Sequence, residues 1–196
     1  MGPSAGRSPG GERQQAADAR QAAANARQQA ADAPAPRYVG VVGGRDCTPE
    51  EARLAFELGR GIAREGWVLV CGGMGGVMAE ACRGARQAGG VTLGILFGDS
   101  RAEGNPYLSY SIVTGMGEAR NVLVVKSCQA VVAVAGAFGT LSEIALANNA
   151  GIPVIGLHSW RVDPAQNRGQ SVYYAEADTP QQAVRLVRDL LSRTTA

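Results

Sequence analysis

The feature that most constrains the fold is an alternation of short apolar runs with amphipathic segments, which begins at Arg37. Runs rich in Val, Ile and Leu predict strands at 38–44, 67–73, 91–98, 111–115, 129–136 and 152–157, and the segment 171–178 brings the total to about six to seven. Strands that are apolar on both faces are typical of a parallel sheet covered on both sides. The sequence therefore predicts an α/β fold with a doubly wound, mainly parallel sheet and helices on both faces.

The segments between these runs carry helical signals. In the clearest of them, 47–66, Thr48 is placed to cap the helix, Pro49 takes the first helical position and Glu51 completes a capping box. Further helices are predicted at 75–90, 117–128, 140–151 and 179–192. A chain of 196 residues has room for one substantial core. We therefore expect a single domain over residues 37–196.

Residues 1–36 differ in composition from the rest of the chain. A seven-residue repeat rich in Arg, Gln and Ala occurs three times, starting at Arg13, Arg20 and Arg27. These residue types favour a helix, but alanine buries little apolar area per heptad. The segment is expected to be a low-complexity tail that is disordered or forms a solvated helix, and a weak oligomerisation helix is the alternative.

Charge and composition exclude several classes of function. A formal net charge of +2 gives no strong basic field, so neither nucleic acid nor a membrane surface is an expected partner. The four cysteines are scattered and His158 is the only histidine, which argues against a disulfide framework and against a metal site. The sequence shows no signal peptide and no long apolar run, so we expect a cytoplasmic protein.

Glycine-rich segments follow three of the predicted strands. They are Gly43-Gly44, 71–78 and 135–140, and they lie where the carboxyl ends of parallel strands meet helix N-termini. Glycine lets the backbone approach a ligand closely, and helix N-termini favour anions. We expect this edge to bind a nucleoside monophosphate or a related phosphorylated small molecule. No P-loop motif is present, and Cys71-Gly72-Gly73 stands where a dinucleotide fold would place a ribose-binding carboxylate.

The stretch Ala133–Glu143, AVAGAFGTLSE, has two interpretations. Thr140 and Glu143 fit the capping-box spacing, so the stretch could be no more than a capped helix start. Its position at the ligand edge favours a phosphate cradle beside a catalytic acid. Arg120 presents a similar choice, because a cation at a helix start is electrostatically unfavourable and suggests an anionic partner. A surface salt bridge is the alternative for Arg120.

Three motifs in order, GGMGGVM, GEARN and AGAFGTLSE, resemble those of the LOG-like family over roughly Tyr38–Leu157. Its best-known members are phosphoribohydrolases that release the base from cytokinin riboside 5′-monophosphates. Details such as NPY and GTLSEIALA are most similar to a branch that includes the molybdenum cofactor carrier protein. The resemblance implies a Rossmann-like domain and a homodimer or higher homo-oligomer.

The resemblance also implies roles for individual residues. Arg120 and Glu143 take the catalytic positions, Gly136, Gly139 and Thr140 hold the phosphate, and the glycines of the loop after the second strand form the opposite wall: Gly72, Gly73, Gly75 and Gly76. With Gly43 and Gly44 these are the candidate site residues; no metal and no cofactor is expected. Ala135, Ala137 and Asn121 depart from the family's pattern and argue against a cytokinin-type substrate.

The older label of this family, lysine decarboxylase, does not fit the chain. Its only lysine, Lys126, lies in an apolar helix body away from the ligand edge, so it is badly placed for a Schiff base with pyridoxal phosphate. The leading hypothesis is hydrolysis of the N-glycosidic bond of a purine nucleoside 5′-monophosphate to free base and ribose 5-phosphate. The alternatives are a non-catalytic carrier or sensor that binds molybdenum cofactor or a nucleotide-derived ligand, and a scaffold without activity.

Overall fold

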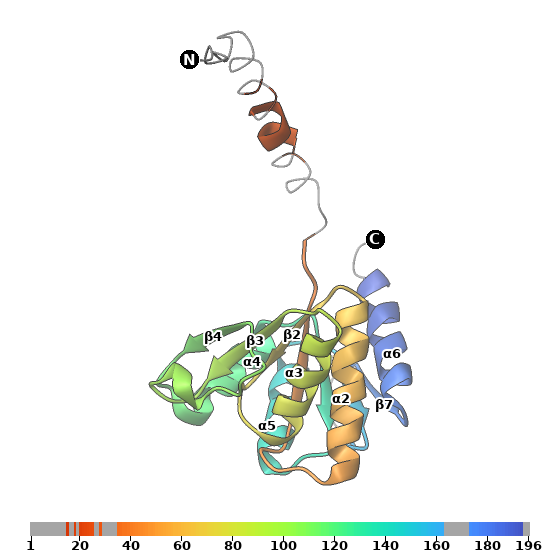
Figure 1. Ribbon diagram of the computed structural model, residues 1–196. Helices are drawn as coiled ribbons and strands as arrows, with labels where there is room; N and C mark the ends of the chain where they lie inside the picture. The colour runs from red at the N-terminus through yellow and green to blue at the C-terminus, as the bar shows by residue number, and fades with distance from the viewer. Residues whose placement is uncertain are drawn as a thin grey trace, which may run out of the picture. The chain divides into compact units, whose positions relative to one another are not determined.

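The computed structural model describes residues 15, 18, 20–25, 28, 35–162 and 173–193. The chain divides into two units, 1–35 and 36–196 (Figure 1). In the first unit, the described residues between 15 and 28 are helical and exposed, and the Gln21 amide donates a hydrogen bond of 2.9 Å to Asn25. A solvated helix is consistent with these residues, and most of the predicted tail lies outside the described part of the chain.

The second unit contains a sheet of seven strands that are all parallel, in the order β4-β3-β2-β1-β5-β6-β7. The strands are β1 (Tyr38–Gly43), β2 (Val68–Cys71), β3 (Thr92–Leu96), β4 (Tyr110–Val113), β5 (Ala130–Val134), β6 (Val154–Leu157) and β7 (Tyr174–Ala177). This confirms the predicted Rossmann-like, doubly wound sheet. The strand order reverses between β1 and β5, and ligands of such folds bind at this point, beyond the carboxyl ends of the strands.

Helices cover both faces of the sheet (Figure 1). One face packs against α2 (Pro49–Arg64), α3 (Gly76–Gln87) and α6 (Pro180–Arg193), and the other against α4 (Asn121–Lys126) and α5 (Phe138–Asn149). Short 3-10 turns are formed by η1 (Arg101–Glu103) and η2 (Gly117–Arg120). The predicted capping box of α2 is confirmed, because the Thr48 hydroxyl accepts from the Glu51 N–H and the Glu51 carboxylate accepts from the Thr48 N–H.

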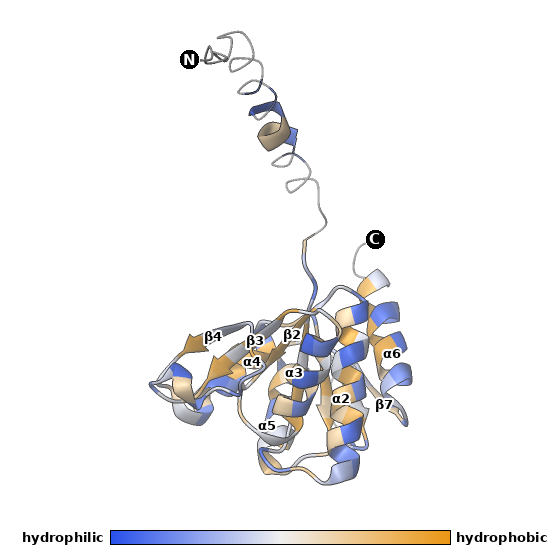
Figure 2. Ribbon diagram, in the orientation of Figure 1, coloured by the Kyte–Doolittle hydropathy of each residue, from blue (hydrophilic) through white to orange (hydrophobic). Residues whose placement is uncertain are grey.

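Alternating residues of the central strand divide the core. Val39 and Val41 of β1 pack with α2, α3 and α6, whereas Val42 packs with α4 and α5. All five residues of β5 are buried, since it has a neighbour on each side and helices on each face. Figure 2 shows hydrophobic residues in the strands and hydrophilic residues along the outer sides of α2, α3 and α6. In the described ranges, no helix combines the length and hydropathy needed to cross a membrane.

Candidate functional site

A cavity of about 440 Å³ lies at the predicted edge of the sheet, beyond the carboxyl ends of β1 and β5. Segments that are distant in the sequence contribute to its walls. The lining residues are Gly43, Gly44 and Arg45 after β1, Met74 and Met78 after β2, Glu118, Arg120 and Asn121 around η2, and Ala137, Gly139, Thr140, Ser142 and Glu143 at α5. A cavity of this size is typical of small-molecule sites.

The structure brings six of the predicted site residues together around this cavity: Gly43, Gly44, Arg120, Gly139, Thr140 and Glu143. Five others lie beside it without lining it: Gly72, Gly73, Gly75, Gly76 and Gly136. The predicted phosphate-binding role of these five stays a prediction, and their contacts within the protein give each of them a packing role.

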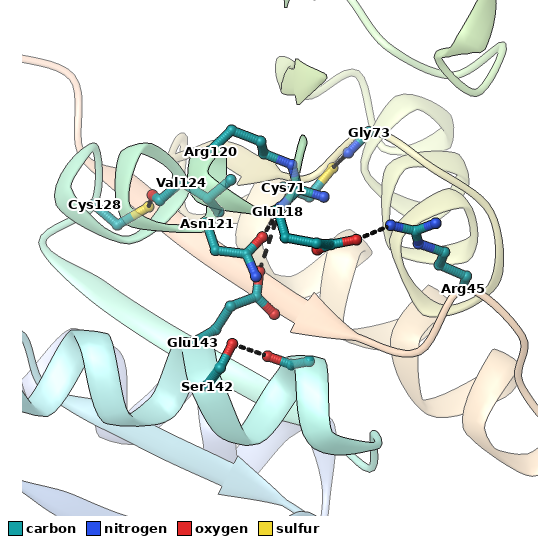
Figure 3. Close-up of polar contacts among 11 residues, drawn as sticks. Arg45, Cys71, Gly73, Glu118, Arg120, Asn121, Val124, Cys128, Ser142 and Glu143 are labelled. Carbon is teal, nitrogen blue, oxygen red and sulfur yellow. Dashed lines mark hydrogen bonds and ion pairs between the residues drawn. The ribbon is translucent and has the colours of Figure 1, made fainter. Parts of the chain in front are cut away.

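Arg120 and Glu143 both line the cavity, and their side chains point toward each other (Figure 3). The Arg120 Nη1 lies 3.6 Å from the Glu143 Oε1, and the two side chains are only 3% and 9% exposed. Nη1 also donates a hydrogen bond to the Asn121 side-chain oxygen, whereas the buried Nε–H of Arg120 has no partner in the described part of the chain. The alternative of a surface salt bridge for Arg120 is therefore wrong, because the pair is buried.

Burial acts on both charged groups in opposite directions. Desolvation lowers the pKa of Arg120, and the negative charges of Glu143 and Glu118 counteract this. Desolvation raises the pKa of Glu143 to about 7; Arg120 opposes this rise and Glu118 adds to it. Near neutral pH, the Glu143 carboxyl can therefore gain or lose a proton at little cost, which suits a group that meets an anionic ligand or a developing cation.

The start of α5 differs from the sequence prediction. The helix begins at Phe138 rather than Thr140, with Ala137 at the N-cap position and no side-chain cap. Glu143 consequently lies in the second turn, so the capping-box interpretation of Thr140 and Glu143 is wrong. The physical reason is that the buried Thr140 side chain packs against the Gly136 backbone, where an added Cβ would lie 2.5 Å from the Thr140 Cβ.

The uncapped start of α5 faces the cavity through Ala137, Gly139 and Thr140. The first N–H groups of a helix lack partners within the helix and attract anions. In the part of the chain that the structure describes, nothing apart from the neighbouring residues and the backbone of α5 itself lies within 4 Å of the position that a Cβ of Gly139 would occupy, so this position is open to a ligand. These features make α5 the wall best suited to a phosphate.

The loop between β5 and α5 has an unusual backbone. Ala135 has φ +45 and Gly136 has φ +98. The first value lies in the left-handed region, which is closed to proline, so the proline of the family's motif could not take the place of Ala135 without a change in this backbone. Side chains after β6 hold this loop: the Ser159 hydroxyl donates to the Ala135 carbonyl at 2.6 Å, and the Trp160 indole donates to the Gly136 and Ala137 carbonyls at 3.1 and 3.2 Å.

The glycines of the loop between β2 and α3 fit against other parts of the protein. A Cβ on Gly72 would lie 2.5 Å from the Arg120 Nη2, so the absence of a side chain makes room for the guanidinium. Gly73 has φ +74 and Gly76 has φ +58, and a Cβ on Gly76 would also overlap the backbone of Gly44 and Arg45. This loop supports Arg120 and the loop after β1 from behind.

Sequence reasoning missed several residues of the cavity wall. Arg45 forms an ion pair with Glu118, and its guanidinium carbon lies 5.0 Å from the centre of the Phe97 ring. Met74, Met78 and Ser142 line the cavity as well. Arg45 directly follows the predicted Gly43-Gly44 loop and Glu118 lies in the GEARN motif, so proximity to the motifs was the available signal.

His158 and Lys126 lie away from this cavity. His158 has φ +52, its Nε2 is 2.9 Å from the Asp178 carbonyl oxygen, and it lines a separate hollow after β6 and β7. Lys126 is exposed at the end of α4 and does not line the cavity. Among the lining residues none is a lysine, so a Schiff-base mechanism has no support there.

Comparisons with known proteins agree with this picture. An uncharacterized protein of Archaeoglobus fulgidus is 38% identical over 146 residues, which are 74% of this chain and 91% of the relative. The molybdenum cofactor binding protein of Rippkaea orientalis matches with a TM-score of 0.73 and 35% identity, over 81% of this chain and 99% of that one. The Moco carrier protein of Chlamydomonas reinhardtii matches with a TM-score of 0.71 and 33% identity, over the same shares.

The family model that describes the SLOG cluster4 family matches residues 36–185. This range contains every strand of the sheet and the whole lining of the cavity. The predicted resemblance to the LOG-like branch near the Moco carrier is confirmed, and the chain belongs to the SLOG cluster4 family.

Proposed function

We propose that this protein is a carrier that binds molybdenum cofactor, or a closely related phosphorylated pterin, in the cavity beside Arg120. One observation carries the proposal: the buried side chain of Arg120 lines the same cavity as the uncapped start of α5, and its Nε–H has no partner in the described part of the chain. Both features favour an anionic group such as a phosphate. The similarity to two molybdenum cofactor binding proteins along nearly their whole length supports the choice of ligand.

The test is direct loading. The purified protein is incubated anaerobically with molybdenum cofactor released from a molybdoenzyme and passed through gel filtration, and the protein fraction is analysed for molybdenum and for the pterin. We expect both to elute with the wild type and to be lost with R120Q. The control R188Q changes an exposed arginine on α6, away from this cavity, and should retain both. Wild-type protein that elutes without molybdenum and pterin contradicts the proposal.

Glycosidic hydrolysis is a second candidate, which a separate observation favours. Glu143 lines the cavity directly beside Arg120, so its carboxylate can meet the anomeric carbon of a bound nucleotide. Water would replace the base at that carbon while the base takes up a proton, and a carboxylate stabilises the oxocarbenium character of such a transition state. AMP would then yield adenine and ribose 5-phosphate.

The hydrolase is tested by incubation with AMP and other purine monophosphates and by chromatography of the products. Release of adenine that E143Q abolishes, with ribose 5-phosphate in equal amount, supports the enzyme. AMP that binds to the wild type and is recovered intact supports the carrier instead. The variant E80Q removes a carboxylate from the outer side of α3 and should not alter either result.

Assembly as a homodimer or higher homo-oligomer completes the proposal. Tyr110 and Ile112 of the edge strand β4 are 67% and 50% exposed. They pair in register with Leu93 and Ile95, which pack on the α4 side of the sheet, so both are directed to that side. We expect light scattering to give at least twice the 20.2 kDa mass of the chain, and I112D to reduce the measured mass toward that value.

A further inference from the structure

Arg45 and Glu118 bring a second pair of charges to the rim of the cavity. Arg45 lies in the loop after β1 and Glu118 in η2, 73 residues apart in the sequence, and both line the cavity. Their side chains form an ion pair that is 49% and 69% exposed (Figure 3). We infer that Glu118 competes with the ligand's phosphate for Arg45, so that Arg45 is an anion-binding residue and Glu118 limits the affinity for anions. This inference rests on the proposed binding of a phosphorylated ligand.

The charges around the cavity explain why Glu118 matters. Among the described residues that line it, two are arginines and two are glutamates, and the formal charges of these four cancel when all are ionised. Glu118 is close enough to influence the inner pair, because its negative charge raises the pKa of both Arg120 and Glu143. An incoming anion is attracted by Arg45 and Arg120 and repelled by Glu118. Removal of the Glu118 charge, as in E118Q, therefore leaves a net positive charge on these four lining residues and frees Arg45 for the anion.

The geometry allows Arg45 to change partners without rebuilding the site. Its backbone is fixed, since Gly76 packs against it and the Val77 N–H donates to the Gly44 carbonyl at 3.1 Å. Its guanidinium also lies over the Phe97 ring, and this contact holds the cation beside the cavity when the ion pair with Glu118 is broken. Exposed ion pairs contribute little to stability, whereas a guanidinium binds phosphate through two parallel hydrogen bonds. Exchange from Glu118 to phosphate is therefore favourable.

The experiment measures dissociation constants by calorimetry for pyrophosphate and AMP, with adenosine as the uncharged counterpart of AMP. The variants are E118Q, R45Q and the double variant. E118Q should bind pyrophosphate and AMP about fivefold more tightly, and R45Q about tenfold more weakly. Adenosine binding should be the same in all of them. The E118Q effect should shrink in the R45Q background, because Glu118 then has no arginine to withhold.

The matched controls are E65Q and R188Q. Glu65 and Arg188 form the same kind of partly exposed bridge between distant segments, with 2.5 Å between Arg188 Nη2 and Glu65 Oε1, and neither lines the cavity. Both variants should bind pyrophosphate like the wild type. An equal tightening by E65Q would reveal a general charge effect and overturn the inference. A full E118Q effect in the R45Q background would overturn it too, because simple repulsion would then explain it.

The outcomes separate the inference from the proposed function. If the wild type binds AMP or molybdenum cofactor but E118Q does not bind anions more tightly, the proposed function stands and the role of Glu118 is refuted. If E118Q tightens pyrophosphate binding through Arg45 while molybdenum cofactor is not retained, the exchange stands and the carrier is refuted. If no variant binds pyrophosphate or AMP and the wild type does not retain molybdenum cofactor, both are refuted.

Discussion

The glycine-rich loops after β2 and β5 have similar compositions, yet their glycines serve different ends. In the loop after β2, Gly72 makes room for the Arg120 guanidinium, and Gly76, where this loop enters α3, makes room for the backbone after β1. At the start of α5, which follows the loop after β5, Gly139 faces the cavity, and within the described residues a Cβ added to it would meet nothing within 4 Å beyond its chain neighbours and the backbone of its own helix. Glycine density alone therefore does not distinguish a wall that touches a ligand from a loop that supports such a wall.

The largest expected effect comes from G76A, which disturbs the packing between the start of α3 and the loop after β1. The alanine would need φ +58 and would overlap the backbone carbonyl carbon of Arg45 at 2.5 Å, where no flexible side chain can yield. We expect the free energy of unfolding to fall by about 3 kcal/mol. Chemical denaturation measures this loss. G66A is the control: Gly66 has φ +73, but among the described residues a Cβ added to it meets nothing within 4 Å beyond its chain neighbours, so G66A measures the cost of the backbone conformation alone, about 1 kcal/mol. Equal losses in both would show that the loop after β2 carries no close packing.

G72A should separate support of Arg120 from support of the fold. A Cβ at this position lies 2.5 Å from the Arg120 Nη2, and the guanidinium is the atom group that must shift. We expect binding of pyrophosphate to weaken about tenfold, with a smaller loss of unfolding free energy than in G76A. Calorimetry and denaturation on the same sample check both. Wild-type affinity in a folded G72A protein would mean that the position of Arg120 does not matter for binding.

G139A should show the opposite combination. Within the described ranges the new methyl group meets no other segment of the protein, and alanine favours the helix, so the melting temperature should stay the same or rise slightly. The methyl group enters the space in which we expect the phosphate, so pyrophosphate binding should weaken about fivefold. Thermal unfolding and calorimetry test this. If binding is unchanged, the phosphate does not lie against the α5 wall.

An effect of similar size is expected on the pH dependence of binding, because Glu143 belongs to α5, which we expect to contact the phosphate. Its pKa is raised from 4.5 to about 7, so the carboxyl is neutral below this value and repels anions above it. The dissociation constant of the wild type relative to E143Q should rise from near parity at about pH 6 to about fivefold at about pH 8. This ratio cancels the ionisation of the ligand itself. A ratio independent of pH would contradict the titration of Glu143.

The same shift affects stability in a defined direction. Because the folded pKa of Glu143 exceeds its ordinary value, the protonated form adds stability that is fully present below about pH 4.5 and is lost as pH rises through about 7. The unfolding free energy of the wild type should therefore decrease relative to that of E143Q between about pH 5 and about pH 8. Denaturation curves at each pH measure this difference.

The sequence was informative about the sheet because each strand is specified locally. Valine-rich runs at 38–44 and 129–136 correspond to β1 and β5, and the capping pattern at Thr48 predicted that α2 begins at Pro49, as observed. It was less informative about α5, where Thr140 carried a capping pattern. Thr140 lies inside α5, where its side chain packs on Gly136 instead of capping the helix. Local sequence patterns do not reveal such a contact.

The candidate site divides in the same way. Arg120 and Glu143 were predicted because each belongs to a motif at the ligand edge, and the fold brings them together. The Arg45–Glu118 pair was not predicted, because its two residues are joined only by the tertiary arrangement of η2 and the loop after β1. For the same reason the packing roles of Gly72 and Gly76 were not predicted, because the residues that they contact lie in other segments of the chain.

The hydrogen bonds of Trp160 give the molecule a built-in optical reporter. The sequence contains two tryptophans; Trp67 is buried in the core, whereas the Trp160 indole N–H is bonded to the carbonyls of the cavity-forming loop and part of its ring reaches solvent. Indole fluorescence responds to changes in hydrogen bonding and hydration. Occupancy of the cavity can thus be followed as a change in tryptophan emission, with no label attached.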